Sequence, residues 1–279
     1  MPPKRLAYIP LMTYPDSAPD NSVEAATVLA SELGSELHMT TFAARIPRVS
    51  TPIGGLLLDI PQMIRGAEEN SRARCRDLQS LVQKSVGAGF RVQCATRDSE
   101  PGSAGALASS EARYFDLVVL PWSKETVSVS DFSQAVVFGS GRPSILVPPA
   151  IRSRPIVHVA IAWDASRVAA RAVADLMPLL ASDCRITILT VQDEKLLPGR
   201  NIAEALSDSL IQRGFVAEAR NVALAGRAVA EALQEAAIET GAELLAMGGF
   251  GHSRVRDFVL GGATKGVFAD LRLPVLLSH

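Results

Sequence analysis

The residues of this sequence whose types and spacing most suggest a binding site are glycines that follow an apolar strand. The apolar run Leu244–Met247 predicts a short buried strand, and Gly248 and Gly251 follow it at once. In an open parallel sheet, ligands bind beyond the carboxyl ends of the strands. Glycine lets the backbone approach a ligand closely and adopts positive φ at little cost. These two glycines are therefore candidates for contact with a bound ligand.

A second pair of glycines lies just before a predicted helix. Gly261 and Gly262 precede the helix Ala263–Asp270, and Thr264 adds a hydroxyl in its first turn. The free N–H groups at the start of a helix bind anions. Two glycine turns beside one helix N-terminus are typical of a phosphate-binding site. The alternative, that these glycines only form tight turns, stays open from the residues alone.

Three common enzyme motifs do not fit this segment. A Walker loop requires Lys and Ser or Thr after its second glycine, but Gly261-x4-Gly266 is followed by Val267. The third glycine of a Rossmann fingerprint would fall at Arg254. The G-x-S-x-G pattern of a nucleophilic serine does not occur.

The elements that position these residues form a repeat on either side of a linker. Pro148–Pro155 holds three prolines, which exclude a helix or a central strand. In the second half, Ser166 is a good N-cap for a helix and Gly241 a good C-cap. The predicted strands of that half are Ile156–Trp163, Arg185–Val191, Phe215–Val222, Leu244–Met247 and Pro274–Leu277, with helices Ala169–Leu180, Asn201–Arg213, Gly226–Thr240 and Ala263–Asp270 between them. In the first half the strands are Leu6–Met12, Leu37–Phe42, Phe90–Ala95, Leu117–Leu120 and Ser144–Val147, with helices Asn21–Gly34, Asp59–Gly87, Ala104–Tyr114 and Gln134–Gly139.

Alternating strands and helices predict an α/β fold whose parallel sheets are covered by helices on both sides. We therefore expect two tandem doubly wound parallel-sheet domains, residues 1–149 and 155–279. Pairing through the last strands, such as Pro274–Leu277, would shield open sheet edges and make an intrachain pseudo-dimer. A homodimer of chains is a further expectation. The long connection Ala43–Leu58 in the first half is expected to pack under the next helix or to meet a partner.

Composition excludes several classes of protein. Hydrophobic residues make up 48% of the 279 positions and charged residues 20%, which suits buried sheets and not disorder. The longest apolar runs fall far short of the roughly 20 residues that a membrane helix needs. The opening Met-Pro-Pro-Lys-Arg precedes too short an apolar stretch for a secretion signal. We expect a cytoplasmic protein with no membrane partner.

The charge balance and the positions of cysteine and histidine argue against nucleic-acid binding, disulfides and metal sites. With 28 basic and 29 acidic residues and no basic stripe, nucleic acid is not expected as a partner. Cys75, Cys94 and Cys184 are scattered and form no C-x-x-C pair, which argues against disulfides or a zinc site. The four histidines are scattered too, so no metal site is expected.

The glycine spacing resembles that of the universal stress protein family, whose adenine-nucleotide motif is G-x2-G-x9-G-[ST]. Here Gly248-x2-Gly251-x9-Gly261 has the same register, between the fourth strand and fourth helix of the second half. The closing Leu273-Pro-Val-Leu-Leu-Ser-His also looks like the last strand of that family. The resemblance covers Ile156–His279 well and Leu6–Val147 more weakly, through element order. It implies the adenine nucleotide alpha-hydrolase-like fold.

The resemblance also implies a site for ATP or another adenine nucleotide, with or without magnesium. Asp164 matches the position that contacts adenine, although its alternative role is to cap the helix that begins near Ser166. Val191 matches the position whose backbone meets the base. His252, together with Arg254, would add charge near the phosphates; the alternative is that both lie in a solvated loop. The complete set of implied nucleotide-binding residues is Asp164, Ala165, Val191, Met247, Gly248, Gly251, His252, Gly261, Gly262 and Thr264.

Two departures from the family pattern bear on binding. Gly262 stands where the family has Ser or Thr, so a hydroxyl for the phosphates is missing unless Thr264 replaces it. In the first half, Pro121 and Lys124 stand where the second half has Gly248 and Gly251. Proline has no N–H and cannot adopt positive φ. The first half is therefore predicted to be a degenerate copy that does not bind ATP in the family manner, with Trp122 packed or lining a different pocket.

Three functions are compatible with these residues. The first is a stress-response regulator that binds an adenine nucleotide in its second domain and has no catalytic residues. The second is a protein-interaction module, with an unknown protein partner, in which the glycine loop no longer binds a ligand. The third is a weak ATPase, since the same residues would serve and only turnover separates it from the first.

Overall fold

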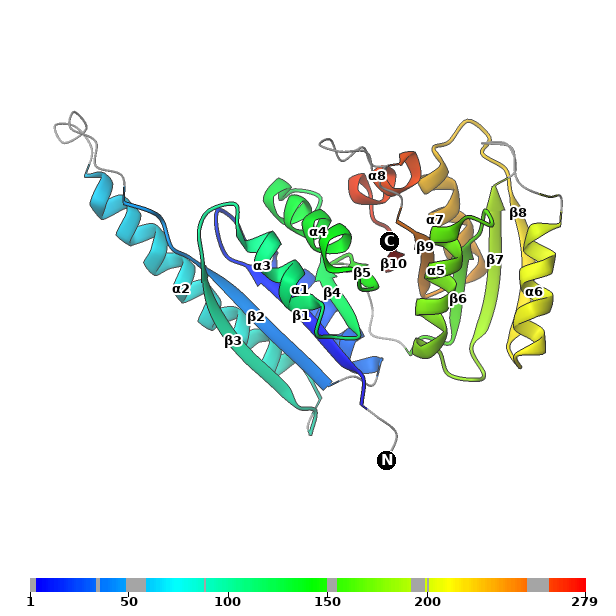
Figure 1. Cartoon of the computed structure of the whole chain (residues 1–279), viewed down its shortest axis with the longest axis horizontal. Coiled ribbons are helices and arrows are strands. Elements are labelled where there is room, and N and C mark those ends of the chain that lie inside the picture. Colours follow the sequence, from blue (N-terminus) through cyan, green and yellow to red (C-terminus); the bar gives the residue numbers. More distant parts are fainter. Residues whose placement is uncertain are drawn as a thin grey trace.

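One ten-stranded sheet runs through the molecule (Figure 1). The computed structural model describes residues 4–33, 36–48, 59–87, 89–149, 155–191, 199, 201–249 and 261–279. The strand order is β3-β2-β1-β4-β5-β10-β9-β6-β7-β8. The strands are β1 (Leu6–Met12), β2 (Glu36–Ala44), β3 (Val92–Ser99), β4 (Leu117–Pro121), β5 (Ser144–Val147), β6 (His158–Ala162), β7 (Arg185–Val191), β8 (Val216–Val222), β9 (Leu244–Gly248) and β10 (Val275–Ser278).

Helices connect the strands on both faces. They are α1 (Asp20–Glu32), α2 (Ile60–Ser85), α3 (Ala104–Ala112), α4 (Val127–Ser140), α5 (Arg167–Leu176), α6 (Ile202–Gln212), α7 (Val229–Thr240) and α8 (Gly262–Ala269), with a short 3-10 helix at Met177–Leu179. Among the described residues, no helix combines the length and the apolar character that crossing a membrane requires.

The two halves mirror each other across the middle of the sheet. Each has the doubly wound order 3-2-1-4-5, and all strand pairs within a half are parallel. The halves join where β5 and β10 pair antiparallel, with Ile145 opposite Leu276. The expected pairing through the last strands is therefore confirmed. It joins the two predicted sheets into one continuous sheet, because it satisfies both inner edges.

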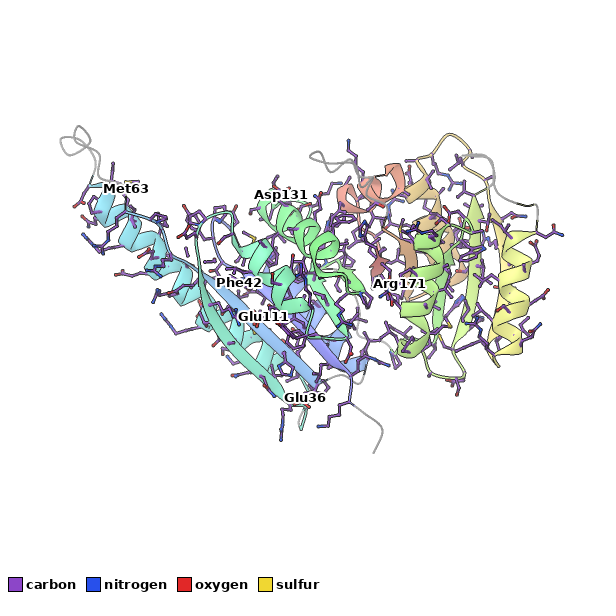
Figure 2. All side chains as sticks on the ribbon, in the orientation of Figure 1. Glu36, Phe42, Met63, Glu111, Asp131 and Arg171 are labelled. Atoms are coloured by element: carbon purple, nitrogen blue, oxygen red, sulfur yellow. The ribbon has the colours of Figure 1, made fainter. Side chains whose placement is uncertain are left out.

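Two apolar cores lie on opposite faces of the sheet. Ile145 and Leu276 belong to the core covered by α1, α2, α5 and α6. Their neighbours Leu146 and Val275 point the other way, into the core covered by α3, α4, α7 and α8. Phe42, labelled in Figure 2, belongs to this second core. Its ring centroid lies 6.2 Å from that of Phe132 in α4. Helices on both faces explain why the strands read as almost continuous apolar runs.

Most elements lie within a few residues of their predicted bounds, and two of the differences have a clear physical reason. Helix α4 begins at Val127, not at Gln134, because burial of Val129 and Phe132 outweighs the weak helix propensity of its serines and valines. Strand β3 runs to Ser99 rather than ending at Ala95, since its exposed polar residues still pair with β2 at the edge of the sheet. The Leu-rich part of the connection before α2 lies outside the described residues.

Candidate functional site

A pocket opens where the strand order of the second half reverses. Strand β6 pairs with β9 on one side and with β7 on the other, and ligands of doubly wound folds bind at such a point. The pocket has a volume of about 260 Å³. It is lined by Ala162, Trp163, Asp164, Ser166, Val168, Ala169, Leu189, Val191, Val229, Leu233, Met247, Gly248, Gly261, Gly262, Ala263 and Thr264. Seven of the ten residues predicted for the site are in this set.

Asp164 reaches the pocket from a sharp turn between β6 and α5. Ala165 has a positive φ of 58°, and the Ser166 amide donates to Asp164 Oδ1 at 2.9 Å. Ser166 Oγ in turn accepts from the Ala169 amide at 3.2 Å, as predicted for an N-cap. Ser166 is therefore the residue that caps the helix, and Asp164 holds the turn before it while its carboxylate also lines the pocket. Ala165 is exposed and shapes the turn instead of lining the pocket.

The floor of the pocket is apolar. Val191 at the end of β7 and Met247 on β9 are buried, at 8% and 4% exposure. Leu189 extends this surface along β7, and Val229 and Leu233 of α7 close it from the side. A flat apolar ligand such as a purine base can pack on this surface, since binding pockets combine apolar walls with a few polar groups.

Gly248 brings β9 close to the helix that follows Asp164. A Cβ at this position would lie 2.6 Å from Val168 Cγ2 and 2.8 Å from the Ala169 amide nitrogen. Any side chain would therefore displace the first turn of α5. Close packing of β9 against α5 therefore requires glycine at this position.

The first turn of α8 faces the pocket from the opposite side. Gly261 is the N-cap, and the first backbone bond within the helix runs from the Lys265 amide to the Gly261 carbonyl at 2.9 Å. The amides of Gly262, Ala263 and Thr264 come before Lys265, in the first turn of the helix. No acidic side chain lies in this first turn, and a Cβ at Gly262 would meet nothing within 4 Å. Thr264 is buried at 1% exposure and lines the pocket. This end of the pocket suits an anion.

Two of the remaining predicted residues fall outside the described part of the chain. Gly251 and His252, together with Arg254, lie in residues 250–260, outside the described part of the chain. Among the residues that are described, no group of three or more His, Cys, Asp or Glu side chains could hold a metal ion.

The comparisons with known proteins bear on the same half of the chain. Residues 156–279 match the model of the Universal stress protein family. This half of the chain belongs to the universal stress protein family. The matched range includes every residue of the pocket. No curated protein matches the chain in sequence.

Solved structures of universal stress proteins share the fold over both halves. One from Archaeoglobus fulgidus DSM 4304 has a TM-score of 0.68 at 15% identity, and the match covers 97% of each chain. A structure from Pseudomonas aeruginosa UCBPP-PA14, described as a putative universal stress protein, has a TM-score of 0.54 at 13% identity and covers 99% of this chain and 93% of its own. A universal stress protein in complex with cAMP covers 51% of this chain and 96% of its own at 15% identity, with a TM-score of 0.31. At these identities the likeness to the first two structures concerns the fold alone.

Several pocket residues of this universal stress protein domain were not predicted from the sequence. Trp163 forms part of the wall, and its Nε1–H donates to the Ile202 carbonyl at 3.0 Å. A tryptophan at the carboxyl end of a strand could have predicted this, because ligands of such sheets bind beyond the strand ends. Val229 and Leu233 carry no such signal, because only the packing of α7 decides which of its faces meets the pocket.

The first half differs at the matching positions. Thr13 directly follows β1, and its hydroxyl lies 2.7 Å from both the Phe42 carbonyl oxygen and Ser71 Oγ. Trp122, after β4, is buried at 4% exposure, and its Nε1–H donates to the Phe268 carbonyl of α8 at 3.3 Å. These side chains are engaged inside the protein. That the first half does not bind a nucleotide stays a prediction.

Proposed function

We propose that the second half binds an adenine nucleotide and that the protein acts as a regulator responding to this ligand. The observation that supports this most is one pocket with a carboxylate, Asp164, on one side and the N-terminus of α8 on the other. An adenine base needs apolar surface and an acceptor for its amine. Phosphate needs N–H donors and positive potential. The pocket offers both at separate ends.

The base is proposed to lie between the turn after β6 and the end of β7. One oxygen of Asp164 accepts the Ser166 N–H. A carboxylate has about four lone-pair sites, so it can also accept from an exocyclic amine. Guanine presents a carbonyl oxygen at the position of that amine and would face the carboxylate with like charge. We therefore expect adenine to be preferred to guanine.

The phosphates are proposed to lie at the first turn of α8. Its N–H groups and a helix dipole of roughly half a positive charge favour an anion there. Gly262 brings no hydroxyl, and losing a charge-assisted hydrogen bond weakens binding by about 1.5–3 kcal/mol, roughly ten- to hundredfold. Affinity is therefore expected to be modest, with most of it due to the nucleoside.

Calorimetric titration of the full chain with ATP, AMP and adenosine, with and without magnesium, tests this proposal. The informative variant is Gly262→Asp. Its side chain has open space, and a carboxylate stabilises a helix N-terminus but repels phosphate. The matched neutral control is Gly262→Asn.

We expect Gly262→Asp to weaken ATP binding by about tenfold or more and to leave adenosine binding unchanged. Gly262→Asn should retain ATP binding within a few-fold. A wild-type protein that binds none of the three at millimolar concentration would overturn the proposal.

A nucleotide-independent interaction module is the second candidate. It is favoured by the packing of the glycines: a Cβ at Gly266 would lie 2.5 Å from Ala230 Cβ, and Gly248 is equally confined by α5. Such glycines would persist without any ligand. Weak ATP hydrolysis, the third candidate, is measured as phosphate release in the titrated samples.

A further inference from the structure

We propose that the first half positions the phosphate end of the pocket in the second half, through the loop Trp122–Thr126 that follows β4. This proposal rests on the proposed function, because it concerns how the nucleotide's phosphates are held. Lys124, which stands where the second half has Gly251, lies in this loop, and Pro121, which stands where the second half has Gly248, directly precedes it. The loop contacts α8.

Two contacts join this loop to the C-terminal end of α8. The Trp122 Nε1–H donates to the Phe268 carbonyl at 3.3 Å, and the indole is 4% exposed. Lys124 Nζ lies 3.5 Å from Asp270 Oδ1. Phe138 of α4 adds a ring contact, with its centroid 6.5 Å from that of Phe268. The first half therefore reaches the end of α8 that lies away from the pocket.

Helix α8 is short enough to transmit a displacement from end to end. It has eight residues, so its axis is about 12 Å long at 1.5 Å per residue. Its first residue, Gly262, lines the pocket, and its last turn carries the Phe268 carbonyl that Trp122 contacts. A tilt or shift of the last turn thus moves the N–H groups proposed to bind phosphate.

The same end of α8 is tied to α7. Gln234 Nε2 donates to the Asp270 carbonyl, and Gln234 Oε1 accepts from the Arg272 amide, both at 2.8 Å. Gly266 of α8 packs closely against Ala230 of α7. The two helices therefore form one packed pair. This pair contributes both apolar and phosphate-facing surface to the pocket, and the first half contacts it from outside.

The two contacts of the loop are expected to contribute unequally to holding α8 in place. The last carbonyls of a helix lack partners within it, so the buried Trp122 N–H satisfies a group that would otherwise be unpaired. Lys124 and Asp270 are 66% and 47% exposed, and exposed ion pairs contribute little. The positioning role therefore belongs to Trp122, and Lys124 is its natural control.

Affinities of ATP and adenosine, measured by calorimetry on full-length Trp122→Phe and Lys124→Met, test this assignment. Phenylalanine keeps an aromatic ring in the buried site and removes the N–H donor together with part of the indole's volume; the comparison of ATP with adenosine separates the two effects. We expect Trp122→Phe to weaken ATP binding about fivefold or more and to leave adenosine binding unchanged, because adenosine has no phosphate for α8 to hold. Lys124→Met should bind both as the wild type does.

Other outcomes have distinct meanings. Equal losses for ATP and adenosine in Trp122→Phe would show general loosening of the domain, and no change in either would show that α8 is fixed by α7 alone. Both results overturn the inference while leaving the proposed function intact. Wild-type protein that binds no nucleotide overturns both together.

Hydrogen exchange on the wild-type chain gives a second measurement without any substitution. Since coupling between sites is reciprocal, ATP should slow exchange of the amides in Trp122–Thr126, and adenosine should slow it less. Identical exchange in this loop with and without saturating ATP would contradict the proposal.

Discussion

Gly248 at the end of β9 lies directly against Val168 in the first turn of α5. A Cβ at Gly248 would be 2.7 Å from the Val168 carbonyl carbon, closer than real Cβ atoms come to backbone. This contact sets the separation between the end of β9 and the helix that follows Asp164. The width of the pocket at this end thus depends on a residue without a side chain.

Replacing Gly248 by Ala is expected to destabilise the protein by about 1–3 kcal/mol, because the added methyl group must displace α5 backbone. Urea unfolding followed by circular dichroism measures this loss. The shift of α5 should also weaken nucleotide binding at Asp164.

Gly262→Ala is the matched control for that substitution. The new methyl group meets nothing within 4 Å at the first position of α8. We expect stability unchanged or raised by about 0.4–1 kcal/mol, since alanine restricts the unfolded chain. Equal unfolding midpoints for Gly248→Ala and Gly262→Ala would contradict the close approach of Gly248 to Val168.

Gly262→Ser restores the hydroxyl that the family motif has after its third glycine. The side chain enters open space beside the N–H groups of α8. We expect affinity for ATP and AMP to rise about tenfold, the effect of one hydrogen bond to a charged phosphate. Calorimetry with adenosine should show no gain. A gain for all three ligands, or for none, would place the phosphates elsewhere.

What the sequence could predict depended on local chemistry. Ser166 as N-cap and Gly241 as C-cap follow from single residue types, and the structure confirms both, with Gly241 at φ 81°. Buried strands follow from apolar runs. The glycine register brought Gly248 and Gly261 to one pocket, because both directly flank elements whose positions were predictable.

What could not be predicted depended on tertiary packing. The merging of two sheets rests on the meeting of Ile145 and Leu276, two residues that no local pattern connects. The pocket face of α7 is chosen by its contact with Gly266, and the burial of Trp122 by the arrival of α8. In each case the deciding partner lies far away in the sequence.

The fragment 155–279, expressed alone, is expected to dimerise. Without β5, the apolar strand β10 becomes an open edge, although its residues Val275 and Leu276 are fully buried in the whole chain. Exposed apolar edges pair with other strands. Because β10 pairs antiparallel with β5, a second β10 can take the same place about a two-fold axis.

Size-exclusion chromatography with light scattering measures the mass of this fragment. We expect twice the mass of one fragment, with the full chain run at equal concentration for comparison. A monomeric, folded fragment would show that β10 does not need a partner strand.

His158 at the start of β6 should make stability depend on pH. Its ring is 2% exposed, Nδ1 lies 3.0 Å from Arg185 Nη2, and Nε2 lies 2.9 Å from Thr187 Oγ1. The arginine can only donate, so Nδ1 is the acceptor and the neutral ring carries its proton on Nε2. Burial and the Arg185 charge lower the pKa of His158 from its ordinary 6.5, against the opposing charges of Glu243 and Glu218.

The lowered pKa fixes the direction of the pH effect. Below pH 6.5 the unfolded chain takes up a proton on His158 that the folded protein does not, so the free energy of unfolding falls as the pH decreases. The fall ends below the folded pKa, where both states are protonated. From about one pH unit above 6.5 the histidine is neutral in both states and contributes no slope.

His158→Gln removes this titration and keeps a side chain that can donate to Thr187. Urea unfolding between pH 5 and 8 should therefore give a flatter profile for the variant at acidic pH and profiles that become parallel about one pH unit above 6.5. Glu218, which accepts from Thr187 at 3.0 Å, and Glu243, which accepts the His158 amide, are present in both proteins and cancel in the comparison. Parallel profiles over the whole range would mean that His158 is protonated as easily in the folded protein as in the unfolded chain, which its contact with Arg185 should prevent.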